Sequence, residues 1–422
     1  MAKSMKIKEN FIYLFIFSTP LIFTFPEILM LLMAALGAIE LLYRNTSTLK
    51  ILNHDTNQTP IMDLVPFFFT LVFFFKLISM AWSELPRSSL NNAFNHIHFL
   101  LWPLIFLFFK NKESTLDQAE RYLCFSMITL CSWYLTALFF FPNSSNATCF
   151  KAGAHDCGTL GAWLGVCLIW LTLAITRAYQ SIKFKLFIFG SYSCAWIAFT
   201  GTKRRTELLG LIVGIFIIFS YRIFTTKKIE WTTILVTISL LASSSFIILD
   251  GAKSINRFER LTTIQNEVST YFEGHEKRIE SSKMSVGGRL EMYNIAFKAI
   301  QERPLLGWGA GIRPKNFPQF ATDPDHLLPF SNFHNLYLQI VLEIGFIGFL
   351  IAMAIFIIVF HQTVIKKYIV NDKEVALIGF GLYFMILWKS LANTTFGYSI
   401  VNTFFVVLTA WLFSNPRLLN KL

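Results

Sequence analysis

The chain has 422 residues, of which 54% are hydrophobic and 15% are charged, and its formal net charge is +12. Average soluble domains carry about 25% charged residues, so this composition excludes a soluble enzyme of two or three domains. Its 46 Phe and 10 Trp exclude a disordered chain. The positive charge suggests nucleic-acid binding in a soluble protein, but in a membrane protein it can record the topology.

Long apolar segments dominate the sequence, and a helix of about 20 such residues crosses a bilayer. They predict an all-α polytopic membrane protein with about twelve transmembrane helices, the first two joined by a tight turn at Pro26–Glu27. The basic N-terminus lacks a small-residue cleavage site, so we expect the first span to be retained. The predicted spans are roughly 11–25, 27–43, 61–81, 95–109, 121–141, 159–176, 185–200, 207–221, 231–249, 334–360, 375–391 and 399–413.

Basic residues in the short loops predict the orientation of these spans. The termini and alternate loops on one side hold 19 Lys and Arg, whereas the short loops on the other side hold 5. We therefore expect both termini in the cytoplasm. The long connection 250–333 then lies outside, and it divides the chain into spans one to nine (1–249), a loop subdomain (250–333), and spans ten to twelve with the C-terminus (334–422).

Helical periodicity appears twice within the loop subdomain. Two sets of apolar residues recur at helical spacing and predict two amphipathic helices, the second ended by Pro304. The Gly-Trp-Gly-Ala-Gly run that follows comes after a helix and a proline, not after a strand. It is therefore better interpreted as a turn against the membrane face than as a dinucleotide fingerprint. The sets are Phe258, Leu261, Val268, Tyr271 and Phe272, and Leu290, Tyr293, Phe297 and Ile300.

Some cations contradict the expected topology. Lys203, Arg204 and Arg205 occupy a short outer loop between spans seven and eight. In one interpretation the topology shifts locally, or these cations contact anionic lipid. In the other, they form an anion-binding site at the start of a helix. Arg289 falls in the first turn of the second loop helix, behind two glycines; an arginine there is more often a solvated charge when it stands alone.

The start of the tenth span carries a polar stripe. His334 lies at the outer interface and can accept a proton near neutral pH, although a lone interfacial histidine usually snorkels. Asn335, Gln339 and Glu343 follow on one helix face, and Gly345 with Gly348 permits close helix approach.

Other polar residues add weaker predictions. We expect substrate contacts from Lys203, Asn335, Tyr337, Gln339 and Lys389. Lys76 is expected to snorkel. His96 and His98 could line the cavity of the anion site, to which Lys389 could also contribute. Cys149 and Cys157 lie in one outer loop, where a disulfide is possible. The Asp-Pro-Asp-His run at 323–326 is weak evidence for a metal, and we expect no metal site.

These exceptions together resemble the bacterial O-antigen ligases, within the group that also contains O-antigen polymerases and protein O-oligosaccharyltransferases. The most specific match is His334-Asn335, nine residues, Gly345, two residues, Gly348. The Gly-Gly-Arg to Gly-Trp-Gly-Ala-Gly stretch resembles the periplasmic-loop signature, with Arg289 at its arginine. The other family arginine follows Thr-x-Thr, but here Lys203 intervenes before Arg204 and Arg205, so either arginine can be the equivalent one.

The resemblance implies a GT-C-like glycosyltransferase of the bacterial inner membrane, with its active site facing the periplasm. The implied donor is a glycan on undecaprenyl pyrophosphate, and the implied acceptor is lipid A–core. The arginines would bind the pyrophosphate and His334 would act as the base, without a metal, a cofactor or nucleic acid, and with inversion at the anomeric carbon. An O-antigen polymerase is the first alternative; a protein-glycosylating member and a transporter or flippase are less favoured.

Overall fold

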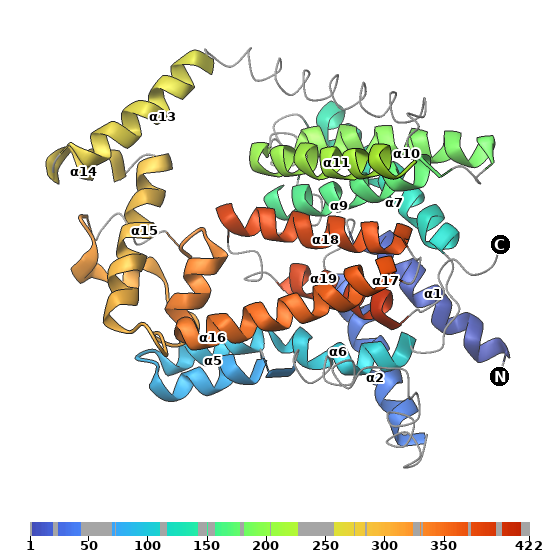
Figure 1. Cartoon of the computed structure of the whole chain (residues 1–422), viewed down its shortest axis with the longest axis horizontal. Helices are drawn as coiled ribbons and strands as arrows, with labels where there is room; N and C mark the ends of the chain where they lie inside the picture. The colour runs from blue at the N-terminus through green and yellow to red at the C-terminus, as the bar shows by residue number, and fades with distance from the viewer. Residues whose placement is uncertain are drawn as a thin grey trace.

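The computed structural model places the helices of this chain in one bundle with a smaller group of helices at one end (Figure 1). No strand occurs among the residues that it describes. Those residues are 2–19, 24–43, 70–71, 73–109, 116–141, 150, 157–177, 181–202, 204–226, 257–273, 275–282, 285–323, 330, 332–369, 373–393 and 399–414.

Most helices of the bundle run side by side, and shorter helices cap or connect them. The bundle helices are α1 (Ala2–Ser18), α2 (Thr24–Tyr43), α6 (Ile97–Phe109), α7 (Leu116–Phe140), α9 (Cys157–Ile175), α10 (Ile182–Gly201), α11 (Arg205–Thr226), α16 (Leu336–Phe360), α18 (Lys373–Ala392) and α19 (Ser399–Ser414). The shorter helices are η1 (Ser79–Trp82), α5 (Pro86–Phe94), η2 (Pro314–Asn316), η3 (Pro318–Phe320), η5 (His361–Ile365) and α17 (Lys366–Ile369).

Six of the described helices are long and apolar enough to cross a membrane, and three more are apolar but shorter. They fit a multi-pass membrane protein, although they do not confirm a count of twelve, and the predicted span 231–249 lies outside the described residues. The predicted turn at Pro26–Glu27 is wrong, because α2 begins at Thr24. Proline is tolerated in the first turn of a helix, where its missing N–H would have no helical partner.

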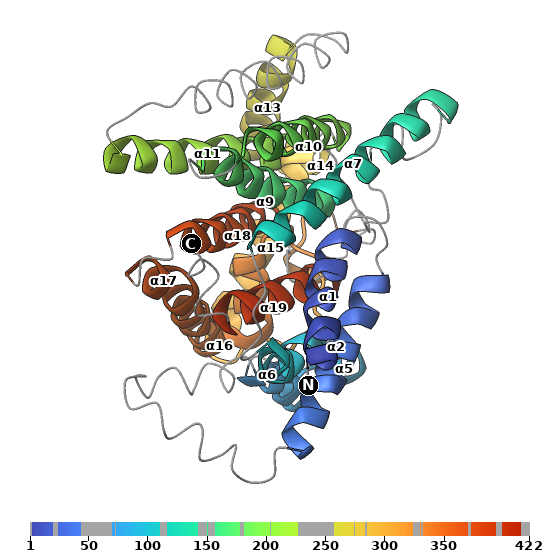
Figure 2. The same ribbon diagram turned by 90° about the vertical axis from the view of Figure 1, so that its right-hand side faces the viewer.

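Helix α9 forms the centre of the bundle. All of its residues are buried, and a view along the bundle shows it between α10 and α11 on one side and α18 on the other (Figure 2). The Trp170 ring stacks on Trp411 of α19 with 6.0 Å between ring centroids. Arg177, which the topology count assigned to a loop, is buried beyond the end of α9 and pairs with Glu120 of α7 at 2.7 Å.

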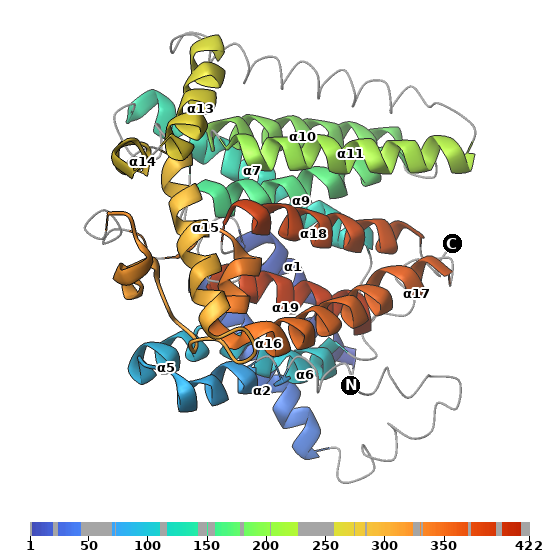
Figure 3. The ribbon, with the colours of Figure 1, turned by 60° about the vertical axis from the view of Figure 1, so that its left-hand side comes forward.

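Three helices cover one end of the bundle, which we call the α15 end: α13 (Arg257–Phe272), α14 (His275–Ser282) and α15 (Ser285–Glu302). The periodicity predicted α13 and α15, and α15 lies across the ends of α16 and α18 (Figure 3). The start of α1 lies at the opposite end (Figure 1). The sequence placed Arg289 in the first turn, but α15 begins at Ser285, so Arg289 falls one turn later.

A carboxylate holds these three helices together. Glu291 of α15 accepts hydrogen bonds from Tyr271 (2.8 Å), from Arg278 (2.8 Å) and from the Thr322 backbone N–H (2.8 Å). Burial raises the pKa of the Glu291 carboxyl, but these hydrogen bonds outweigh burial and the pKa lies below its ordinary value. Glu291 is therefore ionised at neutral pH and fixes α15 against α13, α14 and the segment after η3.

Helix α16 is broken at Gly345, whose φ of 66° and ψ of −176° are not helical. The glycine turn (Pro304–Ile312), which follows α15, fills the break. The Trp308 and Gly309 amides donate to the carbonyls of residues 342 and 343, at 2.7 and 2.9 Å. In return, the amides of residues 346 and 347 donate to the carbonyls of Pro304 and Leu305, at 2.8 and 3.3 Å. The predicted turn against the membrane face is thus a backbone insertion into a helix.

We expect Gly345→Ala to lower the free energy of unfolding by at least about 2 kcal/mol, because a left-handed backbone disfavours a Cβ. That Cβ would also collide with the Leu305 carbonyl. Gly190→Ala is the matched control, since no atom of the described residues beyond its own stretch of α10 lies within 4 Å of its added Cβ. Alanine there should stabilise α10 by up to about 1 kcal/mol. Thermal unfolding of both variants in detergent measures the difference; equal unfolding temperatures would contradict it.

Candidate functional site

His334 lies directly before α16 at the α15 end of the bundle. Its φ of 51° is left-handed, the only such value among the non-glycine residues that the structure describes. Its backbone N–H donates to Asn332 Oδ1 at 2.9 Å, and the Phe330 ring packs edge-on against the half-buried imidazole at 6.3 Å. Backbone strain of this kind persists only where the surroundings hold it, and it gathers at functional sites.

Two arginines from distant parts of the sequence lie near His334. Burial lowers the pKa of the His334 imidazole, and the positive charges of Arg289 and Arg204 lower it further. Both arginine side chains are exposed, and neither forms a hydrogen bond or ion pair with another described residue. The structure thus brings together three residues that the sequence singled out separately: a mostly neutral imidazole and two guanidinium groups available to an anion.

Contacts at the end of α18 connect the elements that carry these residues. Arg204 directly precedes α11, and the Trp388 indole of α18 donates to the Thr206 carbonyl at 2.7 Å. Asn335 caps α16 by accepting from the Leu338 N–H at 3.1 Å, and its amide donates to the Leu391 carbonyl at 3.4 Å. The start of α11 and the start of α16 are therefore both attached to the same turn of α18.

The remaining members of the basic loop add less. Lys203 and the side chain of Arg205 lie outside what the structure describes, so their predicted roles stay predictions.

Lys389 of α18 is almost fully buried and donates to Thr159 Oγ1 at 2.9 Å. Its predicted contribution to an anion site is untested, but this contact directs its ammonium toward α9.

Like Lys389, three more predicted substrate contacts have hydrogen-bond partners inside the protein. Besides Asn335, the Tyr337 hydroxyl donates to the Leu387 carbonyl at 3.3 Å. Gln339 is buried; its amide donates to the Ile312 carbonyl and to Glu343 Oε1, both at 2.9 Å. The polar stripe does point into the bundle, as predicted. In this structure it joins α16 to α18 and to the glycine turn, and substrate contacts from it stay predictions.

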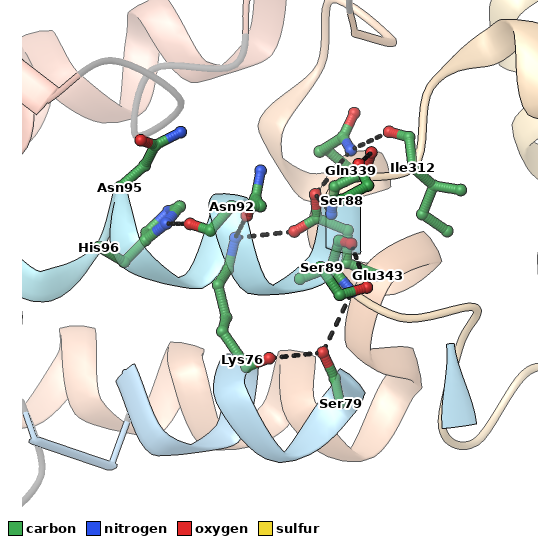
Figure 4. A network of polar contacts seen from close by, with 12 residues as sticks. Lys76, Ser79, Ser88, Ser89, Asn92, Asn95, His96, Ile312, Gln339 and Glu343 are labelled. Atoms are coloured by element: carbon green, nitrogen blue, oxygen red, sulfur yellow. Dashed lines mark hydrogen bonds and ion pairs between the residues drawn. The ribbon is translucent and has the colours of Figure 1, made fainter. Parts of the chain in front are cut away.

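The prediction that Lys76 snorkels is wrong. Its side chain is buried, and its ammonium pairs with Glu343 Oε2 at 2.7 Å and donates to Asn92 Oδ1 at 3.2 Å (Figure 4). Sequence reasoning missed the pair, although one signal was available. An isolated cation and an isolated anion in different spans, both costly in lipid, are candidates to neutralise one another.

An apolar hollow lies between α16, α18, α19 and the start of α6. Its volume is about 850 Å³, including space open to the outside, and its walls are mostly aliphatic and aromatic. It extends along α16 from Leu336 and Tyr337, next to the site, to Val359. His96 lines this hollow and His98 is not among its lining residues; their predicted place in the anion-site cavity stays a prediction.

Cysteine and metal predictions remain partly open. Cys157 is disulfide-bonded, while Cys124, Cys131, Cys167 and Cys194 are free. Cys149 lies outside the described residues, so the Cys149–Cys157 pairing stays a prediction. Within the described part of the chain, no group of three or more His, Cys, Asp or Glu is placed to hold a metal. Asp325 and His326 lie outside the described residues.

Comparison with known proteins adds the family to this geometry. Over 192 residues the chain is 27% identical to an uncharacterized protein of Haemophilus influenzae, and the match covers 44% of this chain and 45% of that protein. Residues 188–353 match a family described as O-antigen ligase. This segment contains Arg204, Arg289, His334 and the glycine turn, and it confirms the resemblance seen in the motifs. Over residues 188–353, the chain is similar to the O-antigen ligase family.

Proposed function

We propose that this protein is a glycosyltransferase that moves O-antigen glycan from undecaprenyl pyrophosphate to a sugar hydroxyl of lipid A–core. The observation that carries the proposal is the proximity of the positive charges of Arg204 and Arg289 to His334. All three residues lie within the segment that matches the O-antigen ligase family. The site belongs to the periplasmic face of the inner membrane in this proposal, with both termini in the cytoplasm.

The arginines bind the pyrophosphate of the donor. A guanidinium group matches the geometry of phosphate oxygens and forms paired, charge-assisted hydrogen bonds. As the bond between the anomeric carbon and the phosphate oxygen breaks, negative charge grows on the pyrophosphate, and fixed cations stabilise it. Exposed side chains at Arg204 and Arg289, without protein partners among the described residues, suit this role. In this mechanism they do the work of a divalent cation.

His334 acts as the general base. Its imidazole accepts the proton of the acceptor hydroxyl while the hydroxyl oxygen bonds to the anomeric carbon and the pyrophosphate leaves. A single displacement of this kind inverts the anomeric configuration. The lowered pKa supports the assignment, because it keeps the imidazole unprotonated at neutral pH. The positive charges that lower it are those proposed to bind the donor, so base and anion site are coupled electrostatically.

The apolar hollow is where we place the polyprenyl chain of the donor. It begins at Leu336 and Tyr337, two and three residues after His334, and continues along α16 toward the opposite end. A pyrophosphate held by Arg204 and Arg289 would therefore have its lipid chain directed between α16 and α18. In this arrangement Asn335, Tyr337, Gln339 and Lys389 support the site, and membrane lipids surround the bundle.

An O-antigen polymerase is the alternative, because it uses the same donor and extends another lipid-linked glycan. Gel analysis of lipopolysaccharide from a deletion strain separates the two. Loss of all O-antigen from the core, with glycan accumulating on its carrier, supports the ligase, whereas a single repeat left on the core supports the polymerase. Carrier-linked glycan accumulating on the cytoplasmic face would instead indicate a flippase.

Transfer from purified lipid-linked glycan to purified core acceptor tests the proposal directly. We expect glycan to appear on the acceptor at equal rates with and without EDTA, because arginines rather than a metal neutralise the leaving group. Loss of transfer in EDTA, restored by one divalent ion, would refute the metal-independent mechanism. No transfer to core acceptor under either condition would refute the ligase.

We expect Arg289→Ala and His334→Ala each to reduce transfer at least about 100-fold, in the range of a lost base or charge stabiliser. Arg204→Ala should be more severe than Lys203→Ala, because the charge of Arg204 acts on His334. Arg87→Ala, which removes an exposed arginine of α5, is the matched control and should leave the rate unchanged. Normal activity in either of the first two variants would remove that residue from the mechanism.

The pH dependence follows from the lowered pKa of His334. Its ordinary pKa is 6.5, and a base with a lower value stays active to a lower pH. We expect kcat/KM to fall on acidification with a midpoint below 6.5, and to level off at pH values well above that midpoint. The residual activity of Arg204→Gln should have a higher midpoint, because one positive charge is lost; an unchanged or lower midpoint would contradict the proximity of the two groups.

A further inference from the structure

A buried polar network connects α16 with the glycine turn, η1 and α5 (Figure 4). Its centre is Glu343, of which 1% is exposed. The two carboxylate oxygens have separate partners. Oε2 pairs with the Lys76 ammonium at 2.7 Å, whereas Oε1 accepts from the Gly311 N–H at 3.0 Å and from the Gln339 amide at 2.9 Å.

The Oε1 side of the network leads to the backbone of His334. Gln339, whose amide Nε2 donates to Glu343, accepts the Phe333 N–H at its own Oε1 at 3.3 Å. Phe333 directly precedes His334, and the left-handed φ of His334 needs support from its surroundings. Removing the acceptor at Glu343 would leave the Gln339 amide with the Ile312 carbonyl as its remaining acceptor, and would loosen the side chain that supports the residue before the strained position.

The same oxygen holds the glycine turn. The Gly311 N–H donates to Glu343, and the neighbouring Ala310 N–H donates to Ser79 Oγ at 3.1 Å. The Ser89 hydroxyl in turn donates to the Ala310 carbonyl at 2.6 Å. The turn continues directly from α15, the helix that carries Arg289. One carboxylate oxygen therefore contacts both the glycine turn and the Gln339 side chain that supports the segment before His334.

We propose that Glu343 is a positioning residue for His334, and that it acts through the hydrogen bonds of Oε1 rather than through its ion pair with Lys76. This inference rests on the proposed function, in which His334 is the base. Glu343 does not touch the reacting groups. Glu343 accepts hydrogen bonds from Gln339 and from the glycine turn. Gln339 in turn accepts the backbone N–H of Phe333, the residue before His334.

A pair of neutral double variants separates the two kinds of contact. Removing only one member of a buried ion pair leaves an uncompensated charge, whereas replacing both members by neutral residues is often tolerated. K76M/E343Q keeps an acceptor oxygen for Gly311 and Gln339, while K76M/E343L does not. Both lack the ion pair and both carry the same change at Lys76, so their difference reports on the Oε1 hydrogen bonds.

We expect K76M/E343Q to keep kcat within about threefold of the unaltered protein and K76M/E343L to lower kcat at least tenfold. KM for the lipid-linked donor should differ by less than threefold between the two, because Arg289 and Arg204 lie on helices with other attachments, at Glu291 and Trp388. Equal kcat in the two variants, or a loss confined to KM, would overturn the inference.

Hydrogen–deuterium exchange gives a readout that does not need activity. The Gly311 and Phe333 amides should exchange faster in K76M/E343L than in K76M/E343Q, while the amides of α9 stay equally protected in both. Equal exchange at Gly311 and Phe333 would refute the anchoring role. If the unaltered protein transfers no glycan but the exchange difference is present, the proposed function fails and the anchor at Glu343 remains.

Discussion

The break in α16 is the constraint on which the site depends. In an apolar environment each backbone N–H and C=O needs a partner within the protein. The break at Gly345 leaves such groups open on both sides, and the glycine turn satisfies them with four hydrogen bonds of its own backbone. Because this turn follows α15, the exchange of hydrogen bonds fixes a helix outside the spans against a helix of the bundle. Arg289 and His334 receive their relative placement from it.

Buried polar groups and the charged groups of the site serve different purposes. The charges of Lys76 and Glu343 are buried and paired, so each neutralises the other within the protein. The guanidinium groups of Arg204 and Arg289 are exposed and lower the pKa of His334. A doubly charged ligand is the natural counterpart of such a site, which is why the pyrophosphate of a lipid carrier fits the proposal.

Local patterns predicted much of this arrangement. The periodic apolar residues of α13 and α15 gave their helices, because one face of each packs against the protein. Charges that contradict the topology indicated Arg204, and the polar stripe at the start of α16 indicated His334, since the bilayer makes such placements costly. That Arg204 and His334 belong to one site could be expected from the family motif, and the fold places them near each other.

What the sequence could not predict depends on contacts between distant residues. Lys76 and Glu343 are separated by 267 positions, and no local pattern distinguishes a paired lysine from a snorkelling one. Gly345 and Gly348 predicted close helix approach, but a glycine that permits close packing and a glycine that breaks a helix look alike in sequence. The backbone of Leu305, and not another helix, approaches Gly345. These two residues are 40 positions apart, so no local pattern predicts their contact. Arg177 does lie in a loop, but its burial and its pairing with Glu120 depend on another helix and could not be predicted.

The complete burial of α9 has a consequence for how the protein is made. Its neighbours α10 and α11 follow at once in the chain, but α18 and α19 are synthesised roughly 200 residues later. Until then the side of α9 that faces α18 and α19 lacks these partners, although the Trp170 indole can already donate to Glu120 of α7. Because almost all side chains of α9 are apolar, the helix can remain in an apolar environment before α18 and α19 are made. The interior is closed last, when the C-terminal helices bring Trp411 to Trp170 and Lys389 to Thr159.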